Sequence, residues 1–94
     1  MNRSEILECA KRCVCGEREQ DYGSPENNFA LIAHLWTSYL RGIGITSECI
    51  AAKDVAAMMI LLKTARIATG RAKDDNYVDI AGYAACGGEI ESDQ

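Results

Sequence analysis

The segment Lys53 to Thr69, KDVAAMMILLKTARIAT, decides the fold class of this chain. It has no glycine or proline, and the residues from Val55 to Leu62 form an uninterrupted apolar run. A helix that is apolar on every side is typical of one that lies centrally in its domain or in a subunit interface. The run is less than half of the ~20 residues that a membrane-spanning helix needs, so we expect no membrane segment.

Three further helices are predicted around this segment. One covers about 4–15, with Asn2 or Ser4 as its cap; a second begins at Ser24-Pro25 and runs to about Arg41; the last runs from Asp74-Asp75 to about Cys86. Gly70 follows the end of the apolar helix, where it can take the left-handed conformation. Because a loop of only about five residues separates the last two helices, they should form an antiparallel hairpin. The prediction is an all-α, four-helix bundle-like fold with a C-terminal antiparallel helical hairpin.

The domain prediction is a single all-α domain over residues 1–94. We expect order from about residue 3 to 88, followed after Gly87-Gly88 by a frayed acidic tail at 89–94. The connector at 43–52 is less regular, with a possible short extended piece at Ile45-Thr46 and Cys49-Ile50.

Composition and charge exclude several classes of protein. The chain is 48% hydrophobic and 26% charged, which is too apolar for intrinsic disorder and too charged for a membrane protein. A net charge of −4 argues against direct nucleic-acid binding. Glu5 and Glu8 stand where a secretory signal would be apolar, so a cytoplasmic location is expected. A chain of this length buries little surface, so we expect a homodimer or higher homo-oligomer formed through the apolar helix.

The five cysteines are an odd number, which favours reduced thiols over a disulfide framework. Cys9, Cys13 and Cys15 are close enough in sequence to suggest a metal site, but they do not form the paired knuckles of structural zinc. Free cysteine is commonly buried, so buried thiols are the preferred interpretation. The single histidine, His34, has no nucleophile that we can place beside it.

Charged residues on the predicted hairpin form the first candidate site. Lys63 and Arg66 lie on one face of the first helix, opposite the turns that carry Asp75 to Gly82. Asp79 lies on a helix that can pack on every side and therefore needs a partner. One hypothesis is a structural ion pair of Lys63 or Arg66 with Asp79. The other is a polar pocket in which Lys63 or Arg66 holds a phosphate and the remaining residues face a ligand or metal: Asp75, Asn76, Asp79 and Tyr83. Gly82, in mid-helix, indicates a close approach of another helix or a ligand.

The loop at 16–25 forms a second candidate site, because it is rich in turn residues and leads into a helix N-terminus that can bind an anion. Arg18 and the free amides near Ser24 could hold a phosphate, with Asp21 and Tyr22 beside them. The alternative is an ordered connector in which Asp21 caps and Tyr22 packs.

Several sequence blocks support a family resemblance. They are Arg18-x-x-Asp21-Tyr22-Gly23-x-Pro25-x-x-Asn28-Phe29, Leu35-Trp36-x-x-Tyr39, Asp54-Val55-Ala56-x-Met58-Met59, Leu62-Lys63-x-x-Arg66 and Lys73-x-Asp75-Asn76-Tyr77-x-Asp79-x-x-Gly82-Tyr83. Together they resemble a functionally uncharacterised domain family common in phages and prophages. That family is more distantly similar to the all-α nucleoside triphosphate pyrophosphohydrolases of the MazG and dimeric dUTPase type.

The resemblance to these enzymes implies a nucleotide ligand and Mg²⁺ held by carboxylates on a helical hairpin, here by Asp79 and Asp75. Only part of the metal-binding pattern of these enzymes is found in this sequence. Asn76-x-x-Asp79 matches the second half of the enzyme pattern with asparagine for glutamate, and Lys63-x-x-Arg66 reverses the charge of the first half. The leading hypothesis is a phage- or prophage-type protein that binds a nucleotide-like ligand with weak or lost hydrolysis. The alternative is a non-enzymatic helical oligomeric interaction module with a structural Lys/Arg–Asp network.

Overall fold

A computed structural model describes residues 1–16, 25–70 and 74–92, with only the backbone described for residues 25–27 and 74. This part of the chain forms four α-helices: α1 (Arg3–Cys15), α3 (Pro25–Gly42), α4 (Ala52–Thr69) and α5 (Asp74–Ser92). The described residues contain no strand, and none forms at Ile45-Thr46 or Cys49-Ile50. The all-α, four-helix prediction is confirmed.

Local hydrogen bonds explain where two of the helices begin. Of the two predicted caps for α1, Asn2 is used: its side-chain oxygen accepts from the Glu5 amide at 2.8 Å, and the Glu5 carboxylate accepts from the Asn2 amide at 3.2 Å. At the start of α4 the Asp54 carboxylate accepts from the Ala51 amide at 2.9 Å. Each contact satisfies a backbone donor that a helix leaves free at its N-terminus.

Two expectations about helix ends are wrong. Gly70 follows α4 with φ −107°, so it is not left-handed, and its amide donates to the Arg66 carbonyl at 2.8 Å. The last helix does not end near Cys86: α5 continues through Gly87 and Gly88 to Ser92, so residues 89–92 are helical rather than a frayed tail. Ile90 is buried in the core, and this packing outweighs the low helix propensity of the two glycines.

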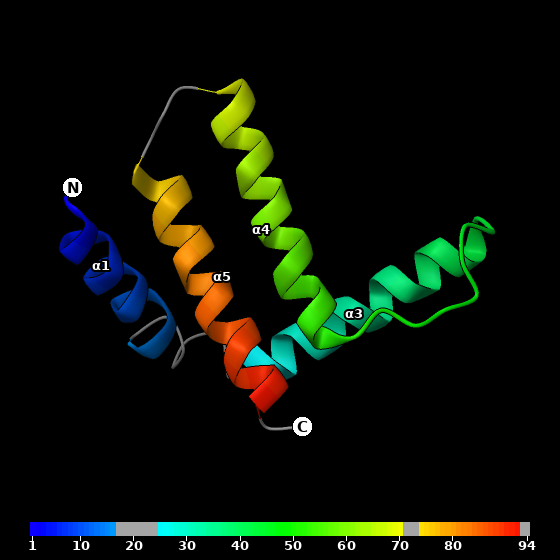
Figure 1. The fold of residues 1–94 in the computed structure, drawn as a ribbon. Coiled ribbons are helices and arrows are strands. Elements are labelled where there is room, and N and C mark those ends of the chain that lie inside the picture. Colours follow the sequence, from blue (N-terminus) through cyan, green and yellow to red (C-terminus); the bar gives the residue numbers. More distant parts are fainter. Residues whose placement is uncertain (17–24, 71–73, 93–94) are drawn as a thin grey trace.

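The helices are arranged around α5 (Figure 1). α4 and α5 form the predicted antiparallel hairpin, α1 packs on α5, and α3 crosses the foot of the hairpin and extends away from it. We expected the apolar helix, α4, to be central or in an interface. α5 is the central helix, because it contacts each of the other three, whereas α4 packs against α3 and α5.

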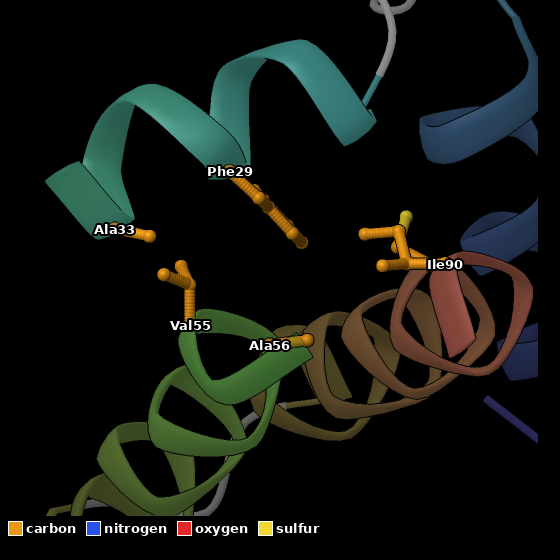
Figure 2. Packing of buried hydrophobic residues seen from close by; sticks show 6 residues of the cluster. Phe29, Ala33, Val55, Ala56 and Ile90 are labelled. Atoms are coloured by element: carbon orange, nitrogen blue, oxygen red, sulfur yellow. The ribbon is translucent and has the colours of Figure 1, made fainter. Parts of the chain in front are cut away.

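The core lies where the first half of α3, the start of α4 and the end of α5 meet. Figure 2 shows Phe29 and Ala33 of α3 facing Val55 and Ala56 of α4, with Ile90 of α5 beside them. Val55 has no exposed surface. The side chains packed around this cluster are half-buried and include Val14, Ile32, Trp36, Met59 and Tyr83.

Glycines on α5 allow two close helix contacts. A Cβ built on Gly82 would lie 3.2 Å from a methyl group of Val14, so the close approach predicted there is made by α1. A Cβ on Gly87 would lie only 2.9 Å from the Cβ of Ala56. The backbones of α4 and α5 therefore approach closely where these two small residues face each other.

Beyond the core, the second half of α3 is held by the connector to α4. The Thr37 hydroxyl, which is buried, accepts from the Ile50 amide at 2.9 Å. Arg41 donates to the Ser47 carbonyl at 2.9 Å and contacts the sulfur of Cys49 at 3.1 Å. In the described ranges, no helix is both long enough and apolar enough to cross a membrane.

The contact between Gly87 and Ala56 makes a testable prediction. Gly87→Ala should lower the free energy of unfolding by about 1–2 kcal/mol, because the clash outweighs the gain in helix propensity. Gly88→Ala is the matched control: its added Cβ meets no atom within 4 Å, so it should raise that free energy by up to about 1 kcal/mol. Urea unfolding followed by circular dichroism measures both. Equal stability of the two variants would contradict the packing described here.

Candidate functional site

Lys63 of α4 and Asp79 of α5 form an ion pair across the hairpin. Their charged atoms, Lys63 Nζ and Asp79 Oδ2, are 3.0 Å apart. The Lys63 side chain is 13% exposed and that of Asp79 is 35% exposed, so the pair is partly shielded from water. Because shielding raises the cost of an unpaired charge, each group stabilises the other in this position.

The remaining hairpin candidates do not all converge on this pair. Arg66 is exposed and makes no ion pair with another described residue. Asp75 is exposed one turn before Asp79, whereas Asn76 is buried. Tyr83 is half-buried, and its ring packs at 6.1 Å from the ring of Phe29. The loop candidates Arg18, Asp21 and Tyr22 lie outside the described residues.

A separate cleft of about 420 Å³ opens between α4 and α5 on the side of Tyr83. Half of the residues that line it are alanine or glycine, and its charged residues lie at the end where α4 begins. The lining consists of Lys53, Asp54, Ala56, Ala57, Ile60, Tyr83, Ala84, Gly87, Gly88 and Glu91. Lys53 and Glu91 form an exposed ion pair at 3.5 Å. Of the predicted site residues, Tyr83 alone is in this cleft.

Sequence reasoning missed this cleft because it ended the last helix at Cys86. Lys53 and Glu91 are equally spaced from the hairpin loop to within one residue, as are Lys63 and Asp79. The register rule that placed Lys63 opposite Asp79 would have placed Lys53 opposite Glu91 had the helix been extended.

The described residues are a poor match for a magnesium site. Mg²⁺ prefers several oxygen ligands in octahedral geometry. Asp79 is paired with an ammonium group, and Asp75 is the only predicted metal ligand left beside it. Across the described ranges, no three His, Cys, Asp or Glu side chains come together in a way that could hold a metal ion.

The cysteines are mostly at the surface. Cys13 and Cys15 are exposed, so the expectation of buried thiols in the α1 cluster is wrong for them; Cys9 is half-buried and Cys86 is buried. The Cys9 sulfur lies 3.1 Å from a guanidinium nitrogen of Arg12. This hydrogen bond raises the pKa of Arg12 above its ordinary value. Helical spacing placed Cys13 correctly on α1, but it could not show that this face of α1 is exposed.

Comparison with known proteins identifies the family. Residues 5–91 match DUF6378, a domain of unknown function, and the chain therefore belongs to this family. This match, together with the two phage relatives described next, confirms the predicted membership of an uncharacterised phage family. The more distant similarity to pyrophosphohydrolases stays a prediction.

Two curated relatives come from mycobacteriophages. The Gene 55 protein of Mycobacterium phage L5 is 48% identical over 79 residues, which is 84% of this chain and 47% of the relative. The Gene 55 protein of Mycobacterium phage D29 is 43% identical over 81 residues, covering 86% of this chain and 50% of the relative. The chain thus spans about half the length of these relatives. No solved structure gives a significant match.

The shielded ion pair makes a second prediction. Lys63→Met keeps most of the side-chain volume but leaves Asp79 unpaired, so the free energy of unfolding should fall by about 1–2 kcal/mol, between the values for exposed and buried pairs. Lys53→Met removes the exposed partner of Glu91 and should change the free energy of unfolding by less than about 0.5 kcal/mol.

Urea unfolding at one protein concentration compares both variants with the wild type. The double variant Lys63→Met/Asp79→Leu should recover part of the loss, because it removes the unpaired carboxylate as well. A loss from Lys63→Met no larger than that from Lys53→Met would show that the pair is not shielded in solution.

Proposed function

We propose that this member of the DUF6378 family is a helical interaction module rather than an enzyme, and that the Lys63–Asp79 pair is structural. The observation that carries the proposal is the 3.0 Å contact between the two charged groups. A carboxylate held by an ammonium group at this distance is already neutralised and is a weak ligand for a cation.

The surface of the described helices gives further support. Large apolar side chains are exposed on both α3 and α4, including Leu31, Leu35, Tyr39, Met58 and Leu61. Extended exposed apolar surface is typical of sites that bind another protein. The acidic charge balance of the chain argues for a protein partner rather than a nucleic acid.

The nucleotide hypothesis makes different demands on the same residues. It requires Lys63 or Arg66 to reach a phosphate while Asp75 and Asp79 face a metal. In the described geometry, the ammonium group of Lys63 already contacts Asp79, so a phosphate would compete with that carboxylate for the same cation. We therefore place nucleotide binding second and let the following experiment decide between the two.

The test is release of pyrophosphate from a panel of dNTPs and NTPs in the presence of Mg²⁺ or Mn²⁺. The expected result is no release above a buffer control, for the wild type and for Asp79→Asn alike. Direct nucleotide binding is measured beside it by calorimetry, and no binding is expected. Asp79→Asn is the relevant variant because it removes the charge while keeping the shape of the side chain.

Release by the wild type that is lost in a folded Asp79→Asn variant would overturn the proposal and make Asp79 part of an active site. Nucleotide binding without release would support the nucleotide hypothesis in its weak-hydrolysis form. Circular dichroism of each preparation separates lost activity from lost folding.

A further inference from the structure

α4 carries an uncovered apolar row on the side that faces away from α5. Met58 is 40%, Leu61 66% and Leu62 46% exposed, whereas Val55 and Ala56 on the core side are 0% and 2% exposed. Met58, Leu61, Ala65 and Ala68 follow one another at intervals of three, four and three residues. This is the spacing of residues that pack one helix along another. Together with Leu62, they are called the α4 seam below.

We infer that the α4 seam packs against α4 of a second copy of this chain, with the two helices antiparallel. The inference rests on the proposed function and names the partner. A two-fold axis near Leu61 and Leu62 would place Met58 of one copy opposite Ala65 of the other, so that large side chains face small ones on both sides of the axis. A surface that is complementary to itself in this way fits a second copy better than an unrelated protein.

Charge favours the antiparallel direction as well. α4 has acidic Asp54 in its first turn and basic Arg66 in its last turn. Antiparallel packing brings Asp54 of each helix toward the last turn of the other, where Arg66 lies, and the two helix dipoles then oppose each other. Parallel packing would align the dipoles and set Met58 against Met58.

The other exposed apolar row lies on α3 and provides a matched control. Leu31, Leu35 and Tyr39 are all exposed, but His34 and Ser38 are exposed among them on the same side. Leu35 is 60% exposed, close to the 66% of Leu61, so the same substitution at either position costs the monomer little. The two positions differ in whether they belong to the α4 seam.

Sedimentation equilibrium in reducing buffer, over a wide range of protein concentrations, tests the inference. We expect the wild type to have twice the monomer mass. Leu61→Asp should raise the dimer dissociation constant by about 100-fold, as loss of a central interface residue does. Leu35→Asp should change the dimer dissociation constant by less than about threefold relative to the wild type. Circular dichroism should show unchanged helix content, and Leu61→Ser is the fallback if Leu61→Asp does not fold.

A size swap tests the antiparallel register. Met58→Ala should leave a gap and Ala65→Met a clash, so each should weaken the dimer. The double variant Met58→Ala/Ala65→Met should restore it in an antiparallel pair, because a large residue again faces a small one. In a parallel pair, the double variant would combine both defects.

A monomeric wild type would overturn the inference, as would dissociation by Leu35→Asp with Leu61→Asp still dimeric. Failure of the double variant to restore the dimer would overturn the antiparallel register. These outcomes are separate from the pyrophosphate test. A monomer without hydrolase activity would overturn the α4 dimer and leave the proposed function in place. A dimer that releases pyrophosphate would overturn the proposed function and leave the dimer in place.

Discussion

The close contact between α4 and α5 at Ala56 and Gly87 is the constraint on which the rest of the structure depends. Because neither residue projects a side chain beyond Cβ, the two backbones approach closely in the register that sets these two residues against each other. That register brings Lys63 to Asp79 and Lys53 to Glu91. It also points Val55, the neighbour of Ala56, toward α3, so the core and the charge pairs follow from the same contact.

The sequence was sufficient to predict the hairpin and to place Lys63 and Arg66 opposite the turns that carry Asp79, because both depend on local spacing. A short loop forces neighbouring helices to be antiparallel, and Lys63 and Asp79 are at matching heights in any such hairpin. The end of α5 could not be placed in this way. Gly87 and Gly88 have low helix propensity, and only the tertiary contacts of Gly87 with Ala56 and of Ile90 with the core overcome it.

Exposure was the second property that spacing could not predict. α4 is apolar on nearly every side, and its sequence does not indicate which side the chain itself covers. The same uncertainty applied to Cys13 and Cys15 on α1, which an argument from residue type placed inside. Burial depends on which elements pack together, and that in turn depends on contacts between segments far apart in the sequence.

The candidate site shows why charged residues alone did not decide the function. A cation and a carboxylate at matching heights can bind each other or share a ligand, and the sequence is the same in both cases. The geometry favours the first arrangement, because Lys63 and Asp79 are already in contact and partly shielded.

The small core gives the uncovered surface its physical importance. Among the described residues, Val55 is the one large side chain that is fully buried, and several other core positions hold alanine or cysteine. Apolar burial is the main favourable term in folding, so a chain with this core has little stability to spare. Covering the α4 seam would add burial that the isolated chain lacks. Association and folding are then coupled, because a partner that binds only the folded chain also stabilises it.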